Sequence, residues 1–307
     1  MTDSYNQENI NLIGGAGAAI AQRNVGYVDL ENGNDSSGEI GTNKAFRTIQ
    51  AFLDDVPAGN DPVSARNVFT AIIAPGDYDE DLAIDIARKR IVLTGPGSWG
   101  LGEFDAADWG ASGTRRNITV TGSLANIDGI RPGLVISSFL PLSEAMTTHE
   151  SYLTKPRISG KIDLSGASGI GSIELALNCE IFGDAGVAID AGAAIIQSYI
   201  YHSRLRGTVT GVNWNFQVAE RSRFDGLITV NGFSLILNSR INAGLTVASA
   251  PPVGLLPSGM VSTYFAGTLT GPAGSGLMDS YTNFVFKANG ALLAGGATKI
   301  IQGDLTP

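Results

Sequence analysis

The sequence predicts an all-β fold, a right-handed single-stranded parallel β-helix with an N-terminal capping α-helix, and three observations lead to this prediction. First, one sequence pattern occurs four times within residues 172 to 247. It consists of a run of alternating large and small or polar residues, a polar corner, one apolar residue and a glycine. Second, the closing glycines step by 24, 19 and 18 residues: Gly183, Gly207, Gly226 and Gly244. Third, a short apolar segment separates each glycine from the next copy of the pattern, so each repeat is predicted to contain three strands.

Repeats of about 20 residues with β-type alternation are typical of stacked coils, because one repeat cannot bury its apolar face alone. Three strands per repeat predict a triangular cross-section, and parallel crossovers are right-handed as a rule. About 220 residues of such coil predict about eleven coils. The glycines that close the repeats are expected to supply positive φ at the turns.

Small residues at the polar corners are expected to stack on one another, because successive coils lie roughly 4.8 Å apart. The corner residues that would form this stack are Cys179, Ser203, Ser222 and Ser239. Cys179 is the single cysteine, which excludes an intrachain disulfide and is predicted to be a small buried hydrophobe.

The same register places charged residues in one exterior row. Each of them directly precedes the inward apolar residue of a short strand: Glu180, Arg204, Arg223 and Arg240. An acid beside a row of cations indicates a solvated ladder or a partner surface, and it does not indicate a general acid and base.

Composition narrows the class of protein. Forty glycines, 16% charged residues and 43% hydrophobic residues suit many short strands and tight turns, and they do not suit a helical bundle or a disordered chain. The formal net charge of -9 argues against a nucleic-acid partner. The longest apolar runs fall short of the roughly 18 residues that a membrane span requires, so no span is expected.

The chain divides into three parts. Residues 1–24 form a polar and then Gly/Ala-rich arm, which is either a flexible tail or a segment that packs on another subunit or a larger assembly. Residues 25–247 form the coils, with a helix at 45–56 that covers the first coil, and residues 98–117 are predicted to be an excursion loop. Residues 248–307 either continue the coils or form a β cap.

Residues 26 to 97 carry a resemblance to a known superfamily. In order, they read Tyr-Val-Asp, Asn-Gly-Asn-Asp, FRTIQAFLDDV, AIIAPGDYDEDLAI and IVLTGPG. This succession resembles the opening coils of the pectin-lyase-like superfamily, whose members include pectate lyases, polygalacturonases and phage tailspikes. The four repeats extend the similarity of architecture to Val247, but not the similarity of any catalytic motif.

Enzymes of that superfamily use carboxylates or calcium on one coil face, and the predicted excursion loop offers one set of acids. Glu103, Asp105 and Asp108 could supply the two carboxyl groups of a glycoside hydrolase, which lie roughly 5 to 9.5 Å apart. Trp99 and Trp109 beside them could stack on sugars. The alternative is a loop that packs its tryptophans on the coil or on a neighbouring subunit.

A second set of acids follows the Pro-Gly turn at residues 75 and 76. Asp77, Asp79 and Asp81 alternate and could hold a hard cation, although the sequence contains no recognisable full cage of oxygen ligands. No cofactor is expected.

These features predict a non-enzymatic virion structural protein, a β-helical decoration, spike or tail-fibre module at the virion surface that mediates assembly, stability or attachment. It is expected to be a homotrimer that contacts capsid or tail proteins, with surface glycans as further candidate ligands. The residues assigned to interfaces are Leu12, Ile13, Ile20, Trp99 and Trp109. The alternatives are a polysaccharide-degrading lyase or glycoside hydrolase of the same superfamily and a non-catalytic adhesin.

Overall fold

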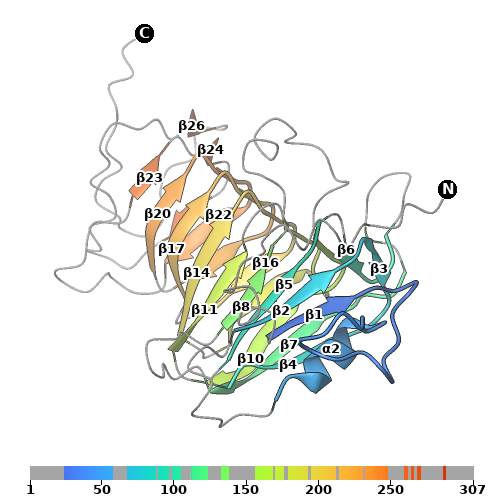
Figure 1. Ribbon diagram of the computed structural model, residues 1–307. Helices are drawn as coiled ribbons and strands as arrows, with labels where there is room; N and C mark the ends of the chain where they lie inside the picture. Colours follow the sequence, from blue (N-terminus) through green and yellow to red (C-terminus); the bar gives the residue numbers. More distant parts are fainter. Residues whose placement is uncertain are drawn as a thin grey trace.

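The residues that the structure describes form three parallel β-sheets and one short helix, which lies at the N-terminal end of the sheets (Figure 1). The computed structural model describes residues 24–57, 68–87, 89–96, 99–104, 111, 113–123, 133–137, 156–168, 170–175, 179–192, 195–211, 214–230, 232–247, 259–261, 264–265, 268–270 and 286–287. Within these residues, all pairs of named strands run parallel, which confirms the prediction of an all-β fold built from parallel strands.

Each sheet takes every third strand of the chain, with minor exceptions at the two ends. The first sheet contains β1 (Val25–Val28), β2 (Val68–Ile73), β5 (Arg90–Thr94), β8 (Gly133–Ile136), β11 (Ile170–Leu175), β14 (Ile195–Tyr201), β17 (Trp214–Glu220), β20 (Gly232–Leu237) and β23 (Gly259–Val261).

The second sheet contains β3 (Gly76–Tyr78), β6 (Trp99–Leu101), β9 (Arg157–Ile158), β12 (Glu180–Ile181), β15 (Arg204–Leu205), β18 (Arg223–Phe224), β21 (Arg240–Ile241), β24 (Tyr264–Phe265) and β26 (Phe286–Lys287). The third contains β4 (Leu82–Asp85), β7 (Ile118–Ser123), β10 (Ile162–Ser168), β13 (Val187–Asp190), β16 (Thr208–Thr210), β19 (Ile228–Val230), β22 (Gly244–Val247) and β25 (Thr268–Thr270).

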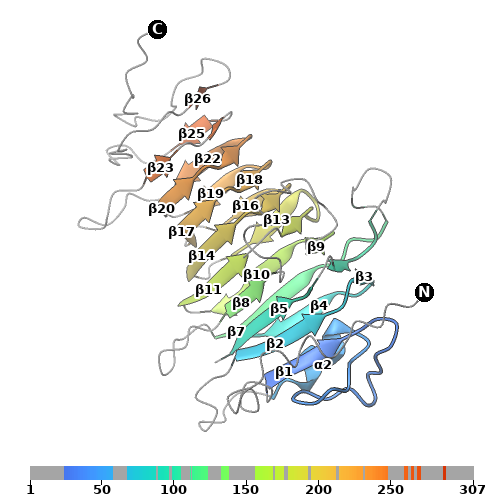
Figure 2. The same cartoon turned by 45° about the horizontal axis from the view of Figure 1, so that its top comes forward.

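One pass through the three sheets is one coil, and the coils stack in sequence order. The colours in Figure 2 run along the stack from blue β1 to orange β23. Strands β23, β24 and β25 join the same three sheets, so the C-terminal segment adds to the stack where it is described. The longest sheets hold nine described strands, which is fewer than the predicted eleven coils.

The core lies between the sheets, because alternate residues of each strand point inward. Strand β2 shows this alternation most clearly, with Phe69, Ala71 and Ile73 buried and the residues between them partly exposed. The same inward position in later coils is taken by further fully buried aliphatic residues: Leu93, Ile136, Ile200 and Ile236.

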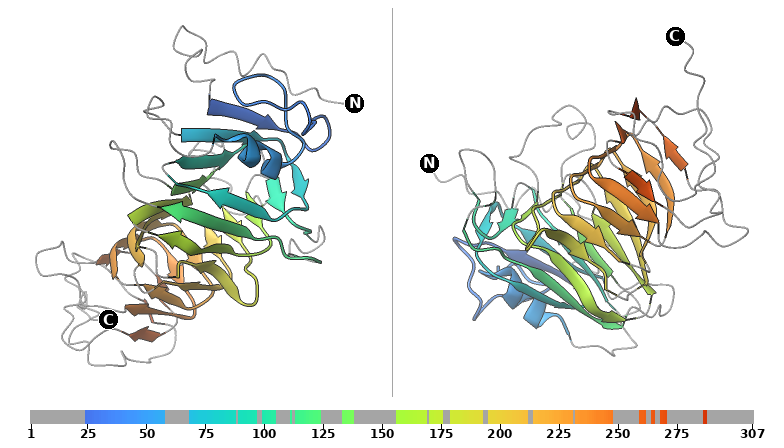
Figure 3. Two further views of the ribbon diagram at one scale, coloured as in Figure 1. Left: turned by 90° about the horizontal axis from the view of Figure 1, so that it is seen from below. Right: turned by 180° about the vertical axis from the view of Figure 1, so that it is seen from behind.

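The capping helix is shorter than predicted. Helix α2 spans Ile49–Asp55, because Thr48 caps its N-terminus by accepting a hydrogen bond from Ala51 N at 3.1 Å. Upstream, the backbone of Phe46 bonds to Tyr27 O and Asp29 N, which holds it extended as a bridge to β1 and not in the predicted helix at 45–56. Figure 3 shows α2 against the first strands of the stack.

The corner residues form the predicted buried stack. Ser203 N donates to Ser222 Oγ at 3.2 Å, and Ser222 N donates to Ser239 Oγ at 3.1 Å, so each hydroxyl ties one coil to the next. Cys179 is buried at the head of this stack and its thiol donates to Ile136 O. The stack satisfies polar groups that would otherwise be buried without partners.

The assignment of positive φ to the closing glycines is wrong at two of the four positions. Gly183 and Gly244 have positive φ. Gly207 and Gly226 do not, and glycine is needed there for a different reason: a Cβ would lie 2.6 Å from a neighbouring backbone atom at Gly207 and 2.3 Å from one at Gly226. The left-handed residues of these coils stand one position before the corner serines: His202, Arg221 and Asn238.

The predicted excursion loop at 98–117 is also corrected, because its first part is a strand. Trp99 begins β6, points inward and is 0% exposed. Its ring is the largest fully buried side chain of the described residues, so it fills the core instead of extending outward.

We expect Ile49→Asp to destabilise the protein by about 3–5 kcal/mol, because it places a carboxylate without a cationic partner in a site that is 0% exposed. Denaturant unfolding measures this loss. The matched control is Ile49→Val, which removes one methylene and should cost about 1 kcal/mol. Equal stability of Ile49→Asp and the parent would show that α2 does not cover the first coil.

Candidate functional site

The outer face of the second sheet carries a charged ladder, which we define as the in-register row of Arg157, Glu180, Arg204, Arg223 and Arg240. Strand pairing places each residue directly beside the next one. The row predicted from Glu180 to Arg240 is therefore confirmed. Arg157 extends the row by one coil, and the Arg-Ile pair that it shares with Arg240-Ile241 was the signal for it.

A second row, two positions further along each strand, neutralises part of the ladder. Arg206 Nε donates to Glu180 Oε1 at 2.8 Å, which links two adjacent coils. Asp225 accepts from Arg204 Nε at 2.9 Å and from Arg223 Nε at 2.7 Å. Asp225 thus bridges arginines of two adjacent strands, whereas Glu180 pairs with Arg204 and Arg206 of the one coil next to its own. Like charges that would repel across the sheet acquire a counter-ion in this way.

The N-terminal end of the ladder is buried, which differs from the predicted solvated row. Glu180 is 1% exposed, and the guanidinium of Arg157 lies 4.0 Å from the ring centroid of Phe104. The guanidinium of Arg206 lies 4.2 Å from the ring centroid of Phe182, so aromatic rings cover both cations. Toward the C-terminal end the side chains open to solvent, from 24% exposed at Arg204 to 44% at Arg223.

The electrostatics favour the charged form of Asp225. Burial raises the pKa of Asp225, but the hydrogen bonds from Arg223 and Arg204 and the positive charges of these two arginines together outweigh burial and lower the pKa below its ordinary value. Burial likewise lowers the pKa of Arg157, and the charges of Glu180 and Asp77 partly offset that change. The ion pairs that Asp225 forms with Arg204 and Arg223 are suited to fastening adjacent coils together.

The acidic turn after Gly76 is engaged in structural contacts. Asp79 accepts from Arg116 Nε at 2.6 Å, and Asp81 accepts from Asn117 N at 2.6 Å, so both tie the turn to the next coil. Glu80 accepts from Ile49 N and Gln50 N at the start of α2. Burial raises the pKa of Asp77, and the charge of Arg157 partly offsets it.

Asp79 and Asp81 both pair with Arg116, whose Nη1 donates to Asp81 Oδ2 at 3.5 Å, and Asp77 lies near the charge of Arg157. Among the described residues, no group of three or more His, Cys, Asp or Glu side chains is arranged to hold a metal ion. In the same part of the chain, no helix is long and apolar enough to cross a membrane.

The other predicted site residues are placed only in part. Glu103 lies at the surface close to Gly113, while Asp105, Asp108 and Trp109 lie outside the described residues, so the proposed carboxylate pair is not located. Leu12, Ile13 and Ile20 lie outside them as well. Trp99 is assigned to an interface by the sequence, but its complete burial within the chain leaves it no surface for a partner.

Sequence reasoning missed two groups of residues. Arg206 and Asp225 complete the ladder, but their role depends on contacts between neighbouring coils that no local pattern shows. Lys89 is buried at an inward position next to a cavity under α2, and its place two residues before Ile91 in an alternating strand was an available signal.

Comparisons of the chain with protein-family models, curated proteins and solved structures find no match.

We expect Glu180→Gln to reduce the free energy of unfolding by about 3 kcal/mol, the lower end of the range for breaking a buried ion pair, because Arg204 and Arg206 are about a quarter exposed. The matched control is Glu220→Gln, which removes a surface pair 3.7 Å from Arg221 and should cost less than about 1 kcal/mol. Denaturant unfolding of both variants makes the comparison, and equal losses would contradict a special role for Glu180.

Proposed function

We propose that this chain is a non-enzymatic structural protein of a virus particle, a decoration, spike or tail-fibre module at the virion surface. In this proposal its three parallel sheets form a right-handed single-stranded parallel β-helix of the pectin-lyase-like type. The strand order, which visits the sheets in turn, supports a coiled path, and the general preference of parallel crossovers supports the right hand. The resemblance of residues 26 to 97 supports the type.

The observation that supports the structural role is that the carboxylates beside the arginines of the charged ladder join successive coils. Glu180 and Asp225 are the carboxylates of this face that lie among arginines, and both bond to arginines of neighbouring coils. In an enzyme, such groups would be left open to a substrate. Here they join successive coils, as Asp79 and Asp81 join the acidic turn to Arg116 and Asn117.

The assembly that we propose is a homotrimer in which the arm at residues 1–24 docks on a neighbouring subunit or on a capsid or tail protein. Closed symmetry prevents open-ended association, and an elongated module repeated about a threefold axis presents three copies of one surface. Surface glycans are further candidate ligands of such a module.

We expect the full chain to sediment as a trimer, and a shortened chain that begins at Gly26 to lose its association with particles. Analytical ultracentrifugation and light scattering at micromolar concentration give the mass, and co-sedimentation with particles tests the arm. A monomeric full chain, together with unchanged particle association after removal of the arm, would contradict the proposed assembly. Saturable depolymerisation of a polysaccharide by the purified chain would contradict the non-enzymatic assignment.

A further inference from the structure

The C-terminal end of the charged ladder places two exposed arginines side by side. Arg223 on β18 and Arg240 on β21 are register partners, so their backbones lie one strand spacing, about 4.8 Å, apart. Both side chains point outward, because the next residue of each strand, Phe224 or Ile241, is fully buried. Arg223 is 44% exposed, and Arg240 is exposed as well. A ligand can therefore reach this end of the ladder from solvent.

The same hydrogen bond holds both side chains. Arg223 Nε donates to Asp225 Oδ1 at 2.7 Å, and Arg240 Nε donates to Asn242 Oδ1 at 2.7 Å. In each case the acceptor stands two positions after the arginine, so the bond repeats from one coil to the next and directs both guanidinium groups alike. A guanidinium group has five N–H donors, and this bond uses the one on Nε. The result is a pair of Nη forks with the same orientation, one strand apart.

The rows around this pair contain more cations than carboxylates. The charged ladder and the second row beside it include five arginines but two carboxylates, Glu180 and Asp225. Glu180 lies at the buried end. At the open end, Asp225 stands beside Arg223, whereas the neutral amide of Asn242 takes the corresponding place beside Arg240. Like charges in register on adjacent strands repel, so an anion bound between the two arginines is favoured.

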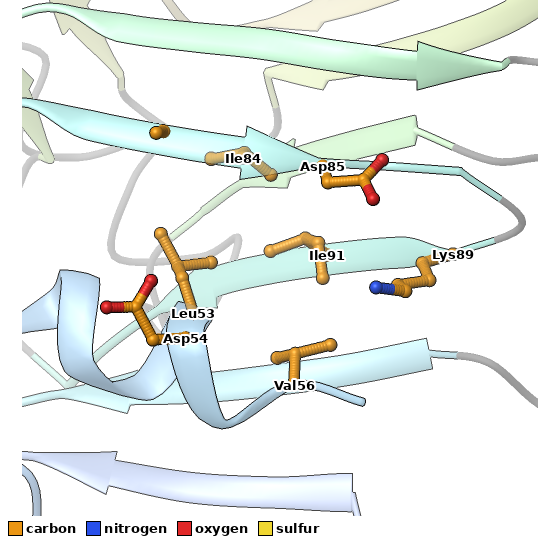
Figure 4. Close-up of a pocket in the computed structure, with 8 residues that line it drawn as sticks. Leu53, Asp54, Val56, Ile84, Asp85, Lys89 and Ile91 are labelled. Atoms are coloured by element: carbon orange, nitrogen blue, oxygen red, sulfur yellow. The ribbon is translucent and has the colours of Figure 1, made fainter. Parts of the chain in front are cut away.

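The half-open cavity under α2 shows the opposite balance of charge (Figure 4). Its lining contains the ammonium group of Lys89 but the two carboxylates of Asp54 and Asp85. An anion would meet a negative sum of charges there, in a chain whose formal net charge is already -9. Of these two places, the open end of the ladder is the one whose charge favours an anion.

The spacing and charge of the arginine pair select the kind of anion. A carboxylate has two oxygens and one charge, which match a single guanidinium fork. A phosphate monoester has three terminal oxygens and about 1.5 to 2 negative charges at pH 7, so it can accept from both forks and neutralise both cations. A sulfate monoester has the three oxygens but one charge. The pair therefore fits a phosphate monoester best.

We propose that Arg223 and Arg240 form a binding site for a small molecule that carries a phosphate monoester, with its phosphate oxygens between the two guanidinium groups. The site is independent of the structural role proposed above, because the bonds from Nε to Asp225 and Asn242 remain in place when the ligand is bound. Two cations at the surface make a weak site, so the affinity is in the millimolar range at low salt and falls as salt is added.

The probe is glycerol 3-phosphate, whose phosphorus NMR signal is followed as the full chain is added at constant, low ionic strength. The parent should bind it saturably in the millimolar range. Arg223→Lys and Arg240→Lys each keep the charge but remove a fork, and each should weaken binding by at least about tenfold, as expected for the loss of a charged hydrogen bond. The matched control is Arg47→Lys, an exposed arginine just before α2, which should bind like the parent.

Three competitors test the chemistry on the parent protein, whatever the stability of the variants. Inorganic phosphate presents the same oxygens and should displace glycerol 3-phosphate at similar concentrations. Acetate and methyl sulfate carry one charge each and should require at least about tenfold higher concentrations. Absence of saturable binding, unchanged affinity in both lysine variants, failure of inorganic phosphate to compete, or equal competition by acetate or methyl sulfate would each overturn the proposal.

Discussion

In-register parallel pairing between successive coils is the constraint on which the rest of this structure depends. It sets each residue directly beside its counterpart one strand away, so serine meets serine at the corner and arginine meets arginine on the outer face. For apolar and hydroxyl side chains this repetition is favourable, because it builds a continuous core and a hydrogen-bonded stack. For like charges it is unfavourable. Asp225 offsets the repulsion by bridging Arg204 and Arg223 of neighbouring coils, and Glu180 offsets it by pairing with Arg206 of the next coil.

The same constraint leaves the first coil with an open end. Helix α2 covers it with Ile49 and Phe52, and Glu80 of the acidic turn bonds to the helix N-terminus, so the cap and the first strands form one unit. The cover is incomplete near the end of the helix, where Lys89 faces the cavity.

The strands, the corner stack and the charged row could be predicted because they repeat, and a repeated pattern shows both period and register. What could not be predicted depends on single contacts between distant segments. The extended backbone at Phe46 follows from its bonds to β1, and the inward position of Trp99 follows from space in the core. The predicted number of coils exceeds the number of strands described in any one sheet, because the early coils are longer than the repeat of the later ones. The register partners Arg90 and Gly133, for example, are 43 residues apart, about twice that repeat.

The most direct test of the stacked coils is a set of distances along the outward row of the third sheet. Nitroxide pairs would join Thr119 to Thr210, Thr229 or Thr246, which lie three, four and five strands away in register, in a Cys179→Ser background diluted with unlabelled chain. Pulsed dipolar spectroscopy should give distances that increase by about 4.8 Å from each pair to the next, reaching about 24 Å between backbones for the last. Distances that do not increase in this order would contradict the in-register stack.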